Sequence, residues 1–308
     1  MTTTLQPVFR DFRESGLEPE QIRSSLAALQ HDEGDAGDAG VILIAGPTGS
    51  GKSNTVEALI RNFEAQQLYG SQVMQIGEIE FLNQERIQYQ HHSNWNEALW
   101  SLRPAHDRIR LFNPAECRTS AEAAMVFEAA YGGHLVITTL HTTNVAETIA
   151  RLDYLGVPRT QQAKMLKLIV NQELVSTLCP HCKVPDPRGP ELSAQLVNHI
   201  FQDWKITLSR RERRAPFFMP RGCEACNYQG TKERTCIAEV LSITHEVGRW
   251  LLEQLDGERI AHYAVSNSLL TTLAEATYKK LCRGIIAYDY VTHLLFPTEN
   301  QMPAGVNQ

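Results

Sequence analysis

Nothing in the 308-residue sequence predicts a segment that crosses a membrane. No apolar run approaches the roughly 18 residues that a spanning helix needs, and residues 1–16 lack the apolar core of a signal peptide. Excess positive charge is also missing, because the formal net charge is −6 at pH 7. That balance argues against a broad nucleic-acid-binding face. These absences predict a globular protein of the cytoplasm.

A disulfide framework is also not expected, because a cytoplasmic chain with seven cysteines rarely carries one. Four of the cysteines form two C-x-x-C pairs: Cys179 with Cys182, and Cys223 with Cys226. Each pair places two thiolates on one tight turn, and two such turns complete a tetrahedral S₄ shell that suits Zn²⁺. Four sulfur ligands leave no position for water, so the predicted zinc site is structural.

Two alternatives to the four-cysteine site stay open at this stage. The four thiols could be free, and His181, between the first two cysteines, could replace one ligand. The remaining cysteines are predicted to be plain apolar residues. They are Cys117, Cys236 and Cys282.

A glycine-rich turn gives the clearest functional signal. GPTGSGKS at 46–53 follows the apolar run 41–45 and precedes 54–67, whose apolar residues recur at helical spacing. Strand, turn and helix together form the phosphate-binding P-loop, in which Lys52 reaches the β- and γ-phosphates and Ser53 ligates Mg²⁺. The alternative is an ordinary glycine-rich turn. The expected ATP-binding residues are Gly46, Pro47, Thr48, Gly49, Ser50, Gly51, Lys52, Ser53 and Asn54.

Strands and helices alternate up to about residue 175, which predicts an α/β fold with a parallel sheet covered on both faces. The expected strands are 41–45, 73–79, 109–112 and 134–140, and the expected helices are 17–30, 54–67, 95–102, 120–131, 145–155 and 160–175. Helical patterns return over 244–295. The predicted divisions are an ATPase core (1–177), a tetracysteine module (178–241) and a C-terminal helical subdomain with a frayed tail (242–308).

Three further segments carry a resemblance to a known family. GHLVITTLHTTNVAETIARL at 133–152 resembles the histidine box of the motor ATPases of type II secretion and type IV pilus assembly. LCPHCK at 178–183 and GCEACNYQGTKERTCIAEVL at 222–241 resemble their metal module. The resemblance implies a RecA-like core, Mg-ATP hydrolysis, and a hexameric ring that docks on an inner-membrane platform protein.

The sequence also departs from the family's pattern. Of the first acidic box only Glu80 is in place. In the second box Glu116 and Arg118 match, but the segment is about three residues longer and carries Pro114, which disfavours a central strand. The family's preceding domain, which lends arginines to the nucleotide, is expected to be absent. A separate chain would then supply it, or the protein is a specialised relative.

The resemblance assigns catalytic roles to three residues. Glu116 would orient or deprotonate water, unless the longer segment turns it to solvent. Glu80 would be a second carboxylate near the γ-phosphate, helping to hold Mg²⁺. His141 follows a buried strand, and strand ends face the ligand crevice of a parallel sheet, so a γ-phosphate sensor competes with a structural histidine. His134 is undecided between the same two roles.

The resulting hypothesis is a motor ATPase at the cytoplasmic face of the inner membrane that powers type II secretion or type IV pilus assembly. Two alternatives remain. One is a hydrolytically weak, nucleotide-binding helper of such a machine, favoured by the altered acidic boxes. The other is a motor for DNA uptake or conjugation, although no direct contact with nucleic acid is expected.

Overall fold

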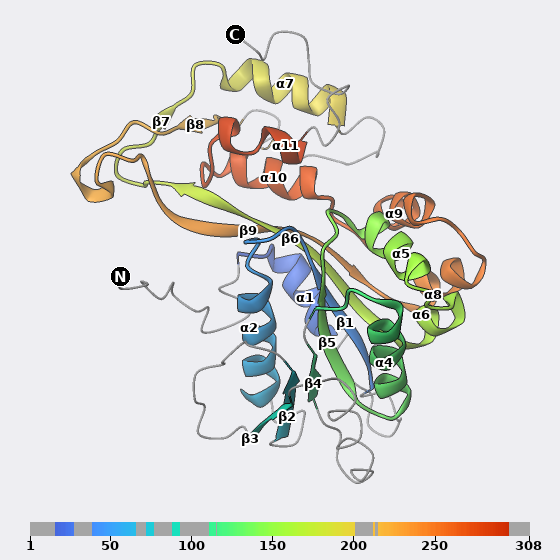
Figure 1. Cartoon of the computed structure of the whole chain (residues 1–308). Helices are drawn as coiled ribbons and strands as arrows, with labels where there is room; N and C mark the ends of the chain where they lie inside the picture. Colours follow the sequence, from blue (N-terminus) through green and yellow to red (C-terminus); the bar gives the residue numbers. More distant parts are fainter. Residues whose placement is uncertain are drawn as a thin grey trace. The chain divides into compact units, whose positions relative to one another are not determined.

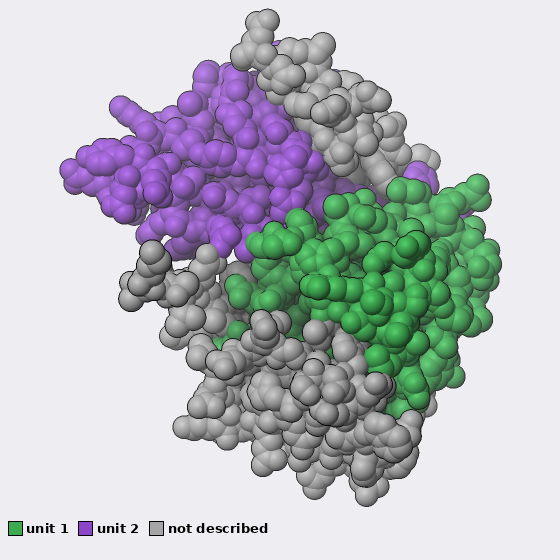
Figure 2. All heavy atoms as spheres, in the orientation of Figure 1, with its two compact units in different colours: residues 1–172, 240–261 green, residues 173–239, 262–308 purple. Residues whose placement is uncertain are grey.

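The computed structural model describes residues 16–27, 39–65, 72–76, 88–92, 111–114, 116–200, 212 and 215–295. Glu80 and the helix expected over 95–102 lie outside these ranges. The chain divides into two compact units, coloured in Figure 2: Met1–Gln172 with Val240–Ala261, and Glu173–Glu239 with His262–Gln308. In the described ranges, no helix is long and apolar enough to cross a membrane.

A seven-stranded sheet has the order β3-β2-β4-β5-β1-β6-β9 (Figure 1). Its strands are β1 (Gly40–Ala45), β2 (Gln72–Ile76), β3 (Gln88–His92), β4 (Leu111–Asn113), β5 (Leu135–Leu140), β6 (Leu166–Leu178) and β9 (Thr231–Ser242). Neighbours from β3 to β6 pair in parallel, which confirms the α/β fold with a parallel sheet. A separate antiparallel pair joins β7 (Val184–Pro185) to β8 (Phe218–Met219).

Helices connect the parallel strands, as such strands require. Of the described helices, those between successive parallel strands are α2 (Lys52–Ala65), α4 (Ser120–Tyr131), α5 (Val145–Tyr154) and α6 (Arg159–Met165). The others are α1 (Pro19–Ala27), α7 (Gly189–Ile200), α8 (His245–Leu252), α9 (Gly257–Ser266), α10 (Leu273–Cys282) and α11 (Thr292–Leu295). Short 3₁₀ turns are η3 (Glu224–Cys226) and η4 (Tyr288–Tyr290). In Figure 1, α2 and α4 lie on opposite sides of the strands that both contact, β1 and β5.

The central strands are buried on both faces because helices cover the sheet. All six residues of β1 are buried, as are five of the six in β5. Local sequence fixes where the covering helices start. Thr119 and Glu122 form a capping box at α4, and the Asn144 side chain accepts from the Glu147 N–H at α5. The expected helices over 120–131 and 145–155 are therefore confirmed.

The helix expected over 160–175 is wrong. Helix α6 ends at Met165, and Leu166–Leu178 forms strand β6 between β1 and β9. A strand buried on both faces carries a near-continuous apolar run, which periodicity alone does not distinguish from a buried helix. The β-branched pair Ile169 and Val170 was the available signal for a strand.

The second unit has its own apolar core, built from the end of β6, the middle of β9, α7 and the C-terminal helices. Its fully buried side chains include Phe217 and Tyr278, whose rings meet edge to face at 5.9 Å. The Tyr278 hydroxyl is hydrogen-bonded to Ser193 of α7 at 2.8 Å. The chain is bonded to the segment after α10 just before the first cysteine pair, since the Leu178 N–H donates to the Ile285 carbonyl.

Candidate functional site

The glycine-rich turn leaves β1 and enters α2 at Lys52, so the predicted strand, turn and helix are present. Gly46, Gly49 and Gly51 all have positive φ, of 147°, 81° and 85°. Gly46 also has no room for a side chain, because a Cβ there would lie 2.2 Å from the carbonyl oxygen of Gln172. The turn is therefore a specifically shaped loop at a helix N-terminus, where a partial positive charge favours anions.

Lys52 is held by the turn itself. Its Nζ donates to the carbonyl oxygens of Gly46 at 2.7 Å and Pro47 at 3.0 Å. Partial burial lowers the pKa of Lys52, and the nearby carboxylate of Glu116 acts in the opposite direction. Ser53, the expected magnesium ligand, is exposed in the first turn of α2. The ammonium group of Lys52 is thus held beside the loop, where an anion bound by the loop could contact it.

Glu116 lies beside His141 in spite of the longer segment. β4 ends at Asn113, so Pro114 comes after the last paired residue of that strand. Past the proline, the Cys117 N–H donates to the Thr139 carbonyl at 3.0 Å, which returns the chain to the edge of β5. The Glu116 carboxylate then lies 3.0 Å from Nε2 of His141.

Electrostatics keep Glu116 ionised. Burial favours the neutral acid, but the guanidinium of Arg118, 2.8 Å from the same carboxylate oxygen, and the neighbouring His141 outweigh it. The net effect is a pKa below the usual range for a glutamate. Only 18% of the side chain is exposed, so a freely solvated glutamate does not describe it.

His141 and His134 lie at opposite ends of β5. His141 follows its carboxyl end, whereas His134 precedes Leu135 and its carbonyl accepts from Gly40, at the start of β1. A six-residue strand separates them by roughly 20 Å. His134 is therefore a buried residue remote from the P-loop, and of the two histidines only His141 belongs to the site.

Parallel register places the site residues at one edge of the sheet. Ala45 at the end of β1 pairs with Leu140 on one side and Asn171 on the other. The P-loop, His141 and Glu116 thus follow neighbouring strand ends, where ligands bind in open α/β sheets. The arrangement offers an anion-binding loop with a lysine, and an ionised carboxylate suited to accept a proton from water.

Two residues of this edge were missed by the sequence analysis. Asn171 and Gln172 end the first half of β6, and their side chains bond to the His141 segment and to the P-loop. They fell inside the helix wrongly expected over 160–175. A pair of amides directly after the apolar run Leu168–Val170 was the available signal for polar contacts at that point of the chain.

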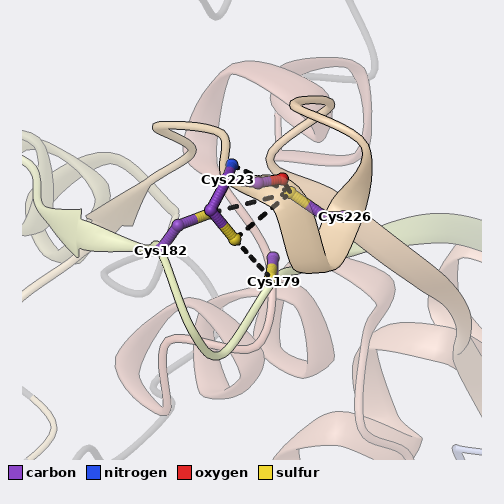
Figure 3. Close-up of side chains that lie close together, drawn as sticks. All are labelled: Cys179, Cys182, Cys223 and Cys226. Carbon is purple, nitrogen blue, oxygen red and sulfur yellow. Dashed lines mark hydrogen bonds between the residues drawn. The ribbon is translucent and has the colours of Figure 1, made fainter.

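The four paired cysteines form one cluster in the second unit. Cys179 and Cys182 lie on the turn after β6, and Cys223 and Cys226 on the turn that includes η3 (Figure 3). Their sulfurs all lie within 4.8 Å of one another. The 179–223, 182–226 and 223–226 pairs are 3.9, 3.8 and 3.8 Å apart. A tetrahedral shell with Zn–S bonds of about 2.3 Å has edges of roughly 3.8 Å, so the geometry fits zinc.

Backbone N–H groups stabilise a thiolate in this cluster. Burial favours the neutral thiol of Cys226, but N–H groups of Cys223 and Gly230, at 3.3 and 3.2 Å from its sulfur, lower its pKa to about 6. A thiolate is the form that binds metal. His181 is exposed and does not belong to the cluster.

The other three cysteines behave as apolar residues. Cys117 and Cys236 are buried, and Cys282 packs partly buried against the core of the second unit. Burial raises the pKa of the Cys117 thiol to about 12, so it stays protonated at neutral pH.

Similarity to known proteins extends over most of the chain. A family model described as "Type II/IV secretion system protein" matches residues 3–293. The type IV pilus assembly ATPase PilB of Thermus thermophilus is 32% identical over 256 residues, which is 82% of this chain and 27% of the relative. PilB of Acinetobacter baylyi is 31% identical over 91% of this chain and 46% of its own length. The chain thus spans less than half the length of these relatives.

Solved structures share the fold. The Legionella pneumophila ATPase DotB superposes with a TM-score of 0.60 at 21% identity, covering 92% of this chain and 65% of that one. The pilus retraction motor PilT with bound ADP has a TM-score of 0.63 at 18% identity, covering 98% of this chain and 70% of that one. At identities this low, the likeness shows a common architecture alone.

Proposed function

Because the chain belongs to the type II/IV secretion system protein family, we propose that its sheet edge binds and hydrolyses Mg-ATP to drive assembly of a type IV pilus or a type II secretion pseudopilus. The observation that carries the proposal is the contact between Glu116 and His141 beside Lys52 and the P-loop. An ionised carboxylate next to a phosphate-binding lysine is what phosphoryl transfer to water needs.

Each residue has a separate task in this scheme. The turn 46–51 and the start of α2 bind the phosphates, and Lys52 exchanges its loop carbonyls for phosphate oxygens. Ser53, exposed at the helix N-terminus, holds Mg²⁺. Glu116 accepts a proton from the attacking water, and His141 contacts the γ-phosphate. Glu80, outside the described residues, is proposed as the second carboxylate.

Replacing Lys52 with alanine is expected to weaken binding of Mg-ATP by about 10- to 100-fold, the effect of losing a hydrogen bond to a charged group. A titration with a fluorescent ATP analogue measures the dissociation constant. Lys164→Ala is the matched control, since that lysine is exposed in α6, where its Nζ lies over the Tyr131 ring. Equal dissociation constants for the wild type and Lys52→Ala would contradict the proposal that this loop binds the nucleotide.

We further propose that the four-cysteine cluster is a structural zinc site. The four sulfurs have the number, chemistry and spacing of a closed Zn²⁺ shell, and no position remains for water. The metal would tie the turn after β6 to the turn at η3. Its proposed contribution is to the folding of the second unit rather than to hydrolysis.

The machine, the assembly and the location are also proposals. Similarity to PilB and to a type II secretion system protein E of Klebsiella pneumoniae, 27% identical over 82% of this chain, supports a pilus or pseudopilus motor. We propose a hexameric ring that works at the cytoplasmic face of the inner membrane through a platform protein. Light scattering with and without Mg-ATP measures the mass: a monomer under both conditions contradicts the ring.

A hydrolytically weak helper protein is the second candidate function. The observation that favours it is the engagement of one Glu116 oxygen by both Arg118 and His141, which competes with a water molecule for that atom. Multiple-turnover hydrolysis by the purified chain separates the candidates. A rate of several per second would remove the helper, whereas binding with slow turnover that a second protein stimulates would support it.

A further inference from the structure

Two buried amides on β6 bond to both halves of the candidate site without lying in either. Asn171 and Gln172 are 0% and 2% exposed. The strand register places Asn171 level with Ala45, so Gln172 lies beside the first residue of the P-loop. No role is assigned to this pair by the P-loop pattern or by the carboxylate and histidine described above.

Gln172 is hydrogen-bonded to the backbone of the P-loop. Its Nε2 donates to the carbonyl oxygen of Ser50 at 2.8 Å. Its backbone carbonyl oxygen lies so close to Gly46 that a Cβ at that position would be only 2.2 Å away. Gln172 therefore lies against the turn at two places, Gly46 and Ser50. Its side chain is bonded to the backbone of Ser50, and its carbonyl oxygen leaves no room for a side chain at position 46.

Asn171 fixes the segment that carries His141. Its Nδ2 donates to the Thr142 hydroxyl at 3.1 Å and to the Thr142 carbonyl at 3.3 Å. Its Oδ1 accepts from the Thr148 hydroxyl at 3.0 Å. Thr142 and Thr148 are also bonded to each other at 2.7 Å, which closes a buried network. An amide suits this position because its nitrogen donates two hydrogen bonds while its oxygen accepts a third.

We propose that Asn171 and Gln172 are positioning residues that hold the His141 segment and the P-loop at a fixed spacing, each acting on a different part of the nucleotide. The inference rests on the proposed function. Gln172 acts through Ser50 on the loop that binds all the phosphates. Asn171 acts through Thr142 on His141, which reaches only the position of the third phosphate.

The two positions therefore differ in their expected effect on nucleotide affinity. Gln172→Met should weaken ADP and a nonhydrolysable ATP analogue alike, by about five- to tenfold. Asn171→Leu should leave the ADP dissociation constant unchanged and lower the preference for the triphosphate analogue by about five- to tenfold. Calorimetric titrations in excess Mg²⁺ with ADP and with the analogue measure both constants without interference from hydrolysis.

Gln162 supplies a matched control in the same unit. It is also fully buried, its Nε2 also donates to a backbone carbonyl (Val157, 3.0 Å), and its Oε1, like that of Gln172, has no partner among the described residues. Gln162→Met should lower the melting temperature as Gln172→Met does, and should leave both nucleotide affinities unchanged. If Asn171→Leu does not fold, Thr142→Val serves in its place, because it removes the hydroxyl that is bonded to Asn171 and Thr148. The same unchanged ADP affinity and lowered preference for the triphosphate analogue are expected.

The outcomes separate the inference from the function beneath it. Parallel losses of ADP and analogue affinity in Asn171→Leu, or losses in Gln162→Met equal to those in Gln172→Met, overturn the positioning roles. A wild-type chain that binds neither nucleotide overturns the proposed function, and the inference with it. If the wild-type chain binds ADP and the triphosphate analogue with equal affinity, the proposed contact of His141 with the γ-phosphate is wrong, and so is the role proposed for Asn171.

Discussion

Glu116→Gln is expected to lower the rate of ATP hydrolysis by about 10²- to 10⁴-fold, the usual contribution of a general base. Glutamine keeps the size of the side chain and an oxygen that Arg118 can donate to, but it does not accept a proton from water. Affinity for Mg-ATP should be kept, because the phosphate-binding loop and Lys52 are untouched. Single-turnover hydrolysis of radiolabelled ATP, with binding measured on the same protein, separates the two effects.

The control for this substitution is Glu122→Gln, six residues along the chain. Glu122 is half-buried and caps α4 by accepting from the N–H groups of Arg118 and Thr119, a task that glutamine also performs. Its hydrolysis rate should equal that of the wild type. If Glu116→Gln hydrolyses ATP as fast as this control, the carboxylate beside His141 is not the base.

Removing the proposed zinc is expected to unfold the cysteine module. Thiolate binding to structural zinc contributes roughly 10 kcal/mol or more in small zinc-binding peptides, most of the stability of an ordinary domain. The purified chain should contain one zinc by elemental analysis. Incubation with a strong chelator, or Cys223→Ser, should lower the melting temperature and expose the region between the cysteine pairs to protease.

A second cysteine of the same unit controls for simple loss of a thiol. Cys282 packs partly buried against the core and lies outside the four-sulfur cluster, so Cys282→Ala should keep the zinc and most of the stability. Wild-type protein that contains no metal when purified without chelator would contradict the zinc proposal, as would a Cys223→Ser variant with unchanged zinc content.

Features coded by short-range sequence were the ones that could be predicted. The P-loop is a local sequence of strand, turn and helix, so its glycines and Lys52 could be placed from residues 41–67 alone. The two cysteine pairs are equally local, since each occupies one turn. The meeting of the pairs is nonlocal, but four cysteines in two C-x-x-C turns have few other ways to complete a shell.

Features that depend on strand register could not be predicted in the same way. Asn171 touches Thr142 only because β6 and β5 flank β1 in one register, and no local pattern specifies which strands become neighbours. Pro114 was a misleading signal for the same reason. Its effect on Glu116 depends on where β4 ends, and β4 ends one residue earlier, at Asn113.

Strands β6 and β9 each begin in one compact unit and end in the other, at Gln172–Glu173 and Glu239–Val240. Neither unit is therefore a continuous stretch of the chain, and a stop codon or internal start near either border would divide a strand. Truncations should yield protein that is lost to proteolysis rather than half-functional. The activities of the nucleotide site and the cysteine cluster must accordingly be separated by point substitutions in the intact chain.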